Sequence, residues 1–330
     1  MKIFVTGGAG FIGSHVVDGL LKKGHELVCL THSKMIERKD VEVVHGDITD
    51  KDSLKSMEGC DAVIANAAAF VINPPKELKK KMHKINVEGT KNTLEVALKY
   101  NVQKIVYTSS VIAIGDIKKM GITNESDLAR HSGNYIYSGI YEKTKYEAHY
   151  VAQKLIDENG APITIAMPSV VFGEDDHSAL GDAIEELVTK KLFGLLAIDT
   201  KLNYIHVEDV AQGIILCLEK GKPEPYIISG SLENNLTFTE FIEKLAKIGD
   251  LELPKRTLSK GALSFAVKLY RLKEILTGKK QSVNKEMFRI LVVNLPLSNE
   301  KAVKELGFSP KPLDIRIKQT IEWYKKKFQA

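Results

Sequence analysis

The sequence predicts an α/β protein built around a doubly wound parallel sheet. Along the first half of the chain, short apolar runs rich in β-branched residues alternate with longer segments of helical periodicity. Turns that contain glycine or aspartate separate many of these segments. Because helices follow strands in regular order, the strands are expected to run parallel, with right-handed crossovers that place helices on both faces of the sheet.

The elements of the first half follow from these patterns in order. Apolar runs predict strands over Lys2–Thr6, Glu26–Leu30, Val41–His45, Asp61–Ala65 and Lys104–Ser109. Helical spacing predicts helices over Phe11–Lys23, Asp50–Met57 and Lys76–Tyr100. This order of strand, turn and helix is the order of a doubly wound fold.

The second half of the chain is less regular. Helices are expected over Ile140–Glu158, Ala179–Lys191, Thr239–Lys247 and Ile315–Phe328, and strands over Ile163–Met167 and Tyr226–Ser229. No Ser/Gly-rich linker divides the chain. Residues 1–170 are therefore expected to carry the sheet, and residues 171–330 to form a smaller, interleaved region. The segment of about 203–230 is expected to return to the sheet.

Composition excludes several classes of protein. There are 47 Lys and Arg residues against 42 Asp and Glu, so the net charge of +5 is too small for a dense basic surface, and no nucleic-acid partner is expected. Three cysteines, Cys29, Cys60 and Cys217, lie far apart, and no HxH or HExxH spacing occurs, so neither disulfides nor a metal site are expected. The first apolar run is too short for a signal peptide, and a cytoplasmic location is expected.

A glycine motif follows the first predicted strand and opens the first predicted helix. In Thr6–Gly13 (TGGAGFIG), Gly7 allows a tight turn, Gly10 allows close approach of a pyrophosphate, and Gly13 allows the helix to pack on the strand. The N-terminus of such a helix offers free N–H groups to phosphates. The motif predicts a dinucleotide-binding Rossmann domain.

The end of the second predicted strand bears on which dinucleotide is bound. An NAD site places a carboxylate there for the ribose 2′-hydroxyl, whereas this chain has Leu30–Lys34 (LTHSK), with basic residues at Lys34, Arg38 and Lys39. This favours NADP(H), with His32 and Lys34 near the 2′-phosphate; NAD(H) remains the alternative. Asp47, with Ile48 beside it, is expected near the adenine.

A tyrosine and a lysine stand four residues apart in a predicted helix. Tyr141 and Lys145 therefore share one face, and an ammonium one turn away would lower the pKa of the phenol. Such a tyrosine can exchange a proton with a substrate oxygen. Hydroxyl residues at Thr108–Ser110 end the fifth predicted strand, where Rossmann ligands bind. Together they predict hydride transfer at a carbonyl or alcohol carbon.

These elements resemble the extended short-chain dehydrogenase/reductase family of epimerases, dehydratases, hydroxysteroid dehydrogenases and dihydroflavonol reductases. The likeness covers nearly the whole chain. Its segments are Thr6–Gly13, Asn66–Ala69, Asn86–Thr90, Tyr107–Gly115, Pro168–Gly173, Ile205–Val210, Leu306–Pro310 and Trp323–Tyr324. The chain departs from the family at Met167, where arginine is usual, and at His32, where the dihydroflavonol-reductase-like branch often has arginine. The non-acidic second strand and Leu202-Asn203 resemble that branch most closely.

The resemblance implies roles for particular residues. Ser110, Tyr141 and Lys145 would form a catalytic triad, which Asn86 completes by holding a water. The cofactor would be bound by the backbone of Phe11 and Ile12, by the turn at Ala67 and Ala68, and by Pro168 and Val170. The branch implies reduction of a small ketone or aldehyde with NADPH, and the family implies a homodimer.

Other interpretations stay open. An NAD-dependent sugar-nucleotide epimerase or dehydratase uses the same fold, and a non-catalytic dinucleotide-binding regulator would keep the fold without needing the triad. Residues 255–289 carry ten basic residues and only Glu274 and Glu286 as acids, mixed with apolar ones. Such a stretch could cover a pocket, form an interface, or lie on an anionic membrane.

Overall fold

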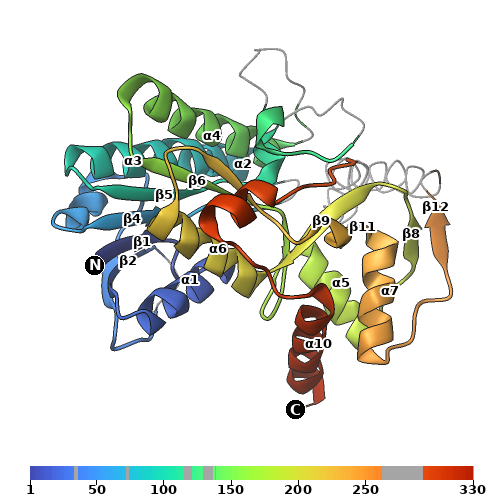
Figure 1. The fold of residues 1–330 in the computed structure, drawn as a ribbon. Coiled ribbons are helices and arrows are strands. Elements are labelled where there is room, and N and C mark those ends of the chain that lie inside the picture. Colours follow the sequence, from blue (N-terminus) through green and yellow to red (C-terminus); the bar gives the residue numbers. More distant parts are fainter. Residues whose placement is uncertain are drawn as a thin grey trace.

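A sheet of seven parallel strands forms the centre of the protein (Figure 1). The computed structural model describes residues 1–32, 36–71, 74–114, 121–128, 137, 139–259, 261 and 293–329. The strands are β1 (Lys2–Thr6), β2 (Glu26–Thr31), β3 (Glu42–His45), β4 (Ala62–Ala65), β5 (Lys104–Thr108), β6 (Ile163–Pro168) and β10 (Pro225–Ile228). Their order across the sheet is β10-β6-β5-β4-β1-β2-β3. The predicted α/β fold with a doubly wound parallel sheet is confirmed, and the strand order reverses between β1 and β4.

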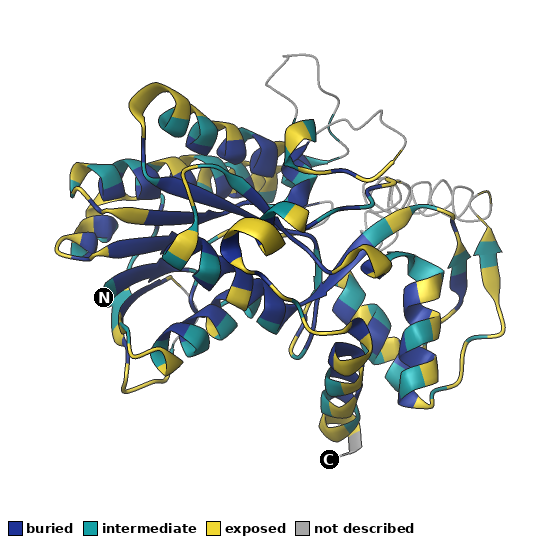
Figure 2. Cartoon of the chain, in the orientation of Figure 1, coloured by how far each residue is buried: buried dark blue, intermediate teal, exposed yellow. Residues whose placement is uncertain are grey.

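Helices cover both faces of this sheet (Figure 1). The helices α1 (Phe11–Lys22) and α6 (Val207–Lys220) pack on one face. The helices α3 (Thr90–Lys99) and α4 (Ile140–Asn159) pack on the other, together with the 3-10 helix η1 (Lys51–Met57). Alternate strand residues point to opposite faces of the sheet and pack in a hydrophobic core on each face. Phe4 packs on the side of α3 and α4, and Val5 on the side of α1 and α6. The inner strands are consequently almost wholly buried, whereas the edge strand β3 is exposed or half-buried along its length (Figure 2).

The long helix expected over 76–100 forms, with an irregular middle. It consists of α2 (Lys76–His83), the π-helical turn η2 (Lys84–Gly89) and α3, which follow one another without a break. A π-turn widens the helix locally and changes the direction of the side chains around it. Asn86, which lies in this turn, is buried.

A smaller region packs beside the carboxyl ends of the sheet. It contains the sheet β11-β9-β7 and the strand pair β8–β12. Its strands are β7 (Val170–Phe172), β8 (Leu195–Ala197), β9 (Lys201–His206), β11 (Asn235–Thr237) and β12 (Thr257–Ser259), and its helices are α5 (Ala179–Val188), α7 (Phe238–Gly249) and α10 (Leu313–Gln329). Aromatic residues such as Phe172, Tyr204 and Phe241 form its core.

The chain enters and leaves this region more than once. It passes from β6 into β7 and α5, returns to the central sheet through α6 and β10, and then forms α7. Four short helices complete the described chain: η3 (Val111–Ile114), η4 (Glu125–Asp127), η5 (Leu232–Asn234) and η6 (Ala302–Leu306). The two regions are therefore interleaved along the sequence.

Candidate active site

The glycine motif forms a tight turn between β1 and α1. Gly7 has φ of +72°, and a Cβ there would lie 2.8 Å from the backbone nitrogen of Ala67. A Cβ on Gly13 would overlap the carbonyl oxygen of Gly7, and Gly10 donates its N–H to that oxygen at 3.0 Å. No side chain caps the N-terminus of α1, so the N–H groups of its first turn, from Phe11 onward, have no capping partner and can bind an anion.

The turn after β4 is joined to the glycine turn. The Thr6 hydroxyl accepts hydrogen bonds from the N–H groups of Asn66 and Ala67, both at 3.1 Å. This brings Ala67 and Ala68 beside the N-terminus of α1, although some 60 residues lie between them. The two strand ends flank the point where the strand order reverses, which is where doubly wound folds bind their ligands.

The end of β2 carries no acidic side chain. Thr31 is buried, and His32 is exposed with its Nε2 3.5 Å from an oxygen of Asp47. Burial would raise the pKa of Asp47, but hydrogen bonds from Thr49 outweigh it and hold the pKa below its usual range. Asp47 is therefore an ionised partner for His32 and for its own turn.

Three further residues are candidates for the adenosine half: Arg38, Ile48 and Lys34. Arg38 bonds both Asp18 and Asp40, so its guanidinium is already matched by carboxylates. The Ile48 side chain is buried against Gly89, where it contributes packing. Lys34 lies outside the described residues.

Asn86 fastens the turn after β4 to α4. Its Oδ1 accepts from the Ala69 N–H at 2.7 Å, while its Nδ2 donates to the Ala69 carbonyl at 2.9 Å and to the Thr144 hydroxyl at 3.0 Å. These bonds use both amide protons. Asn86 thus joins the turn after β4 to α4, and the water-holding role that the family resemblance implies for it stays a prediction.

Ser110 and Tyr141 meet at the end of β5. A hydrogen bond joins their side chains, and the Ser110 hydroxyl also accepts from the N–H of Ile112 at 3.3 Å. The ring of Phe70 packs edge-on against Tyr141, with 4.7 Å between centroids. Burial raises the pKa of Tyr141 to about 12, and the bond with Ser110 opposes this only in part. The phenol is therefore protonated at neutral pH.

Lys145 lies one turn further along α4 and is almost wholly buried. Its Nζ donates to the carbonyl of Thr108 at 2.9 Å and stands 5.5 Å from the centre of the Tyr107 ring. Burial lowers its pKa to about 8. Because the ammonium bonds Thr108 and not the phenol, the expected lowering of the Tyr141 pKa is absent from this arrangement.

The end of β6 brings the chain back to the site. Pro168 ends β6 and the half-buried Val170 begins β7, while between them Ser169 donates its N–H to the Ile228 carbonyl at 3.1 Å. The buried amide of Asn203 on β9 accepts from the Gly230 N–H at 2.7 Å. The ends of β6, β9 and β10 are thus tied together on the side of the sheet where β5 ends.

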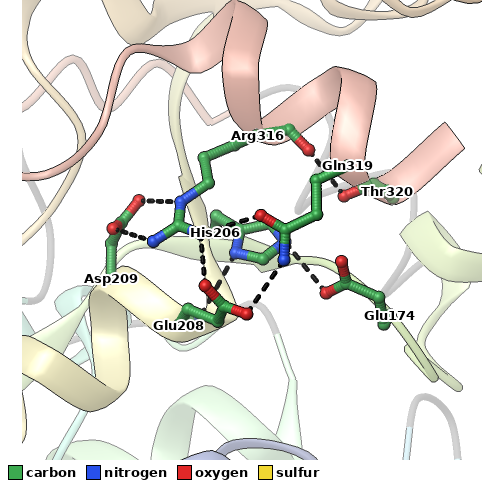
Figure 3. A network of polar contacts seen from close by, with 7 residues as sticks. All are labelled: Glu174, His206, Glu208, Asp209, Arg316, Gln319 and Thr320. Atoms are coloured by element: carbon green, nitrogen blue, oxygen red, sulfur yellow. Dashed lines mark hydrogen bonds and ion pairs between the residues drawn. The ribbon is translucent and has the colours of Figure 1, made fainter. Parts of the chain in front are cut away.

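A second buried cation lies away from these residues, between α6 and α10 (Figure 3). The Arg316 guanidinium bonds both oxygens of Asp209 and one oxygen of Glu208. Gln319 donates to the other oxygen of Glu208 at 2.9 Å. His206 caps α6 and holds Glu174 within 3.0 Å. The group joins the C-terminal helix to the start of α6.

The remaining expectations concern partners. Of the basic stretch 255–289, only 255–259 and residue 261 are described; there, Arg256 packs over the exposed ring of Phe193 at 4.9 Å. The rest of that stretch lies outside the described residues, and the membrane contact and the homodimer stay predictions. In the part of the chain that the structure describes, no helix has the length and apolar character to cross a membrane.

The grouped residues fit a dinucleotide by shape and by chemistry. The glycine turn is packed so closely that a Cβ at Gly7 or Gly13 would overlap neighbouring backbone, whereas a Cβ at Gly10 would meet only the Gly7 carbonyl oxygen within 4 Å, which leaves room for a pyrophosphate beside Gly10. The buried Lys145 ammonium has no carboxylate partner among the described residues, and Thr108 Oγ1 is buried without a hydrogen-bond partner there. A ribose hydroxyl can satisfy such groups. Fold and site together define an enzyme of the NAD(P)-dependent oxidoreductase class.

Comparisons with known proteins agree with this class. The model of the NAD dependent epimerase/dehydratase family matches residues 3–229, and the chain belongs to that family. A proposed dihydroflavonol 4-reductase of Synechocystis sp. is 28% identical over 97% of this chain and 94% of its own. A 3-beta-hydroxysteroid dehydrogenase of Mycolicibacterium neoaurum is 24% identical over 94% and 87%.

Solved structures are similar over the whole chain. The structure of gox2253 has a TM-score of 0.79 and 28% identity, and covers 99% of this chain and 98% of that one. The UDP-glucose 4-epimerase of Thermotoga maritima has a TM-score of 0.76 at 22% identity, with 99% and 100% covered, and shows the shared fold. The predicted family is thus confirmed, whereas its members catalyse several reactions.

Proposed function

We propose that the protein is an NADP(H)-dependent reductase that converts a ketone or aldehyde to the alcohol. The observation that carries this proposal is the pair formed by Ser110 and Tyr141 at the end of β5, where the Phe70 ring packs against the phenol. A proton donor is what carbonyl reduction needs beside the carbonyl oxygen. The full-length likeness to a proposed dihydroflavonol 4-reductase supports the same reaction.

Ser110 and Tyr141 have separate roles in the proposed reduction. NADPH, when bound, supplies the hydride that reduces the carbonyl carbon. Ser110 donates a hydrogen bond to the carbonyl oxygen and stabilises the negative charge that develops there. Tyr141 gives its proton to that oxygen, so the carbonyl gains one hydride and one proton and becomes an alcohol. Solvent then reprotonates Tyr141.

Lys145 and the glycine turn would hold the cofactor. The ammonium of Lys145 keeps two protons beyond the one it gives to Thr108, and these can bond the ribose next to the nicotinamide. The N–H groups of Phe11 and Ile12 would bind the pyrophosphate at the start of α1. Pro168 and Val170 would line the nicotinamide.

The preference for NADP(H) rests on the end of β2. An NAD site has a carboxylate for the ribose 2′-hydroxyl at the end of this strand, where the chain has Thr31 and His32. The exposed His32 side chain can contact the 2′-phosphate of NADP(H). The ion pairs of Arg38 favour a second candidate function, an NAD-dependent epimerase or dehydratase. The Arg38 guanidinium is already paired with Asp18 and Asp40, which leaves it less available to a 2′-phosphate. Nucleotide released from denatured protein distinguishes the two: retained NAD+ favours the second function, and empty protein that binds NADPH ahead of NADH favours the reductase.

The mechanism is tested with Tyr141→Phe. We expect this variant to bind NADPH with unchanged affinity and to lose about 100- to 10,000-fold in turnover, since it lacks the transferable proton. Tyr150→Phe, at an exposed position of the same helix, is the matched control. Full turnover by Tyr141→Phe would refute the assigned role.

A further inference from the structure

His149 is a buried titratable side chain that the mechanism above does not use. It lies on α4, and its Nδ1 stands 3.0 Å from the hydroxyl of Ser109, which is also buried. Ser109 in turn donates its N–H to Ala166 of β6 at 2.8 Å. His149 therefore joins the middle of α4 to Ser109, the residue that directly follows β5.

The position of Ser109 makes this contact relevant to the site. Its neighbour on one side is Thr108, whose carbonyl receives the Lys145 ammonium, and its neighbour on the other is Ser110, whose hydroxyl meets the phenol. One shift of the Ser109 backbone would displace both partners together. Catalytic groups tolerate such shifts poorly, because about 1 Å of misplacement can cost about 100-fold in rate.

The charge of His149 is also set by the site. Burial, and then the charge of Lys145 one turn away, lower its pKa to about 4. The imidazole is therefore neutral at neutral pH and can exchange a hydrogen bond with Ser109. A second cation here would oppose the first, whereas a carboxylate would pair with it.

Other charged groups around α4 are further from this face or turned outward. On α4 itself, Glu142 is buried about 10 Å away, two helical turns from His149. From α2 and η2, His83 is part-exposed and pairs with Glu147, while Lys84 is exposed.

The remaining neighbours of α4 are mostly uncharged near this face. On α3, Lys91 is exposed. From η3 and β6 come apolar residues and Thr164. From β5 comes the phenol of Tyr107, whose pKa burial raises. Lys145 is the one charged group that acts on His149 among the described residues.

We propose that His149 is a positioning residue of the active site: its neutral imidazole bonds Ser109 and thereby fixes the end of β5 against α4. It also places no carboxylate beside Lys145, whose Nζ is bonded by the backbone carbonyl of Thr108. The proposal rests on the function proposed above, because it concerns the same residues.

Three substitutions separate these two roles. His149→Gln keeps a hydrogen-bonding group and no charge, so kcat is expected within about threefold of the parent, with an unchanged pH profile. His149→Leu leaves the Ser109 hydroxyl buried and unpaired, so kcat is expected to fall about tenfold with little change in KM. His149→Glu places a carboxylate beside Lys145, so the basic limb of the pH profile is expected to move up by about one unit.

The measurements are the pH dependence of kcat and KM and, separately, the pH dependence of NADPH binding followed by nicotinamide fluorescence. Lys154→Gln removes one positive charge from the exposed side of α4 and serves as the matched control, with no expected shift. If the His149→Leu protein does not fold, the His149→Gln and His149→Glu proteins still test the proposal, through the basic limb of the pH profile of kcat. Equal loss in the Gln and Leu variants, or a Glu variant whose basic limb stays in place, would overturn the proposal. Turnover by Tyr141→Phe would instead overturn the proposed function, so the two failures are distinguishable.

Discussion

Lys145 and Arg316 are both cations with 4% of their surface exposed, and their surroundings differ. Arg316 is bonded by two carboxylates that lie more than 100 residues away in the sequence. Lys145 is bonded by a backbone carbonyl, and its pKa falls to about 8. A buried charge that is fully paired maintains the fold, whereas one left without a counter-charge is available to a ligand. The comparison separates the structural part of the molecule from its site.

Removing the paired cation should have the largest effect on stability. In Arg316→Met, Asp209 stays buried without its partner, and the free energy of unfolding is expected to drop by about 3 kcal/mol. Denaturant unfolding measures the loss. Lys318→Met, an exposed position on the same helix, should change it by less than about 0.5 kcal/mol. A drop below about 1 kcal/mol in Arg316→Met would show that the network contributes little.

Removing Lys145, the cation without a counter-charge, should change the free energy of unfolding in the opposite direction. In Lys145→Met, the desolvation cost of a buried ammonium disappears and one hydrogen bond is lost, so the free energy of unfolding is expected to rise by about 1 kcal/mol. Turnover should fall at the same time, by about 100-fold or more, with weakened NADPH binding. Lys143→Met, exposed on the same helix, is the control. A destabilised Lys145→Met protein would contradict the comparison.

The stability difference between Lys145→Met and the parent should also depend on pH. The folded-state pKa of Lys145 is about 8 and its ordinary value is 10.5, so between these values the unfolded chain binds more protons than the folded one. The stability contributed through this group therefore rises with pH across that window. Lys145→Met should be the more stable protein below pH 8, and its advantage should be lost as the pH rises toward 10.5, where the missing hydrogen bond to Thr108 makes it the less stable one. An advantage that is the same at every pH would assign it to packing.

The helix that carries Tyr141 and Lys145 and the glycine turn could be predicted because their signals are local. The spacing of Tyr141 and Lys145 places them on one helical face, and the glycines require a turn that other residues cannot form. The same spacing continues to His149, which was the available signal for that residue. Its partner Ser109, however, is 40 residues away, and only the folded chain identifies it.

The short strands of the smaller region and the bonds of Arg316 depend on contacts between segments that are far apart in the sequence. The strands β7, β8, β11 and β12 are three residues long, too short for any periodicity to show. The bonds between Arg316 and Asp209 likewise join segments that no local pattern relates. The bonds of the Asn86 amide to Ala69 and Thr144 also join segments that are distant in the sequence, so no local pattern predicts them.

The pairing of α1 with α6 has a consequence for synthesis of the chain. The two helices touch so closely that a Cβ on Gly19 would lie 2.5 Å from the Ile215 side chain. A nascent chain that has reached residue 170 has made β1 to β6 but neither α6 nor β10. The apolar face of α1 then remains open to solvent while about 60 more residues are added, roughly 3 to 12 seconds of translation. The dinucleotide-binding half is therefore exposed to chaperones during synthesis and becomes complete only when a later segment returns to it.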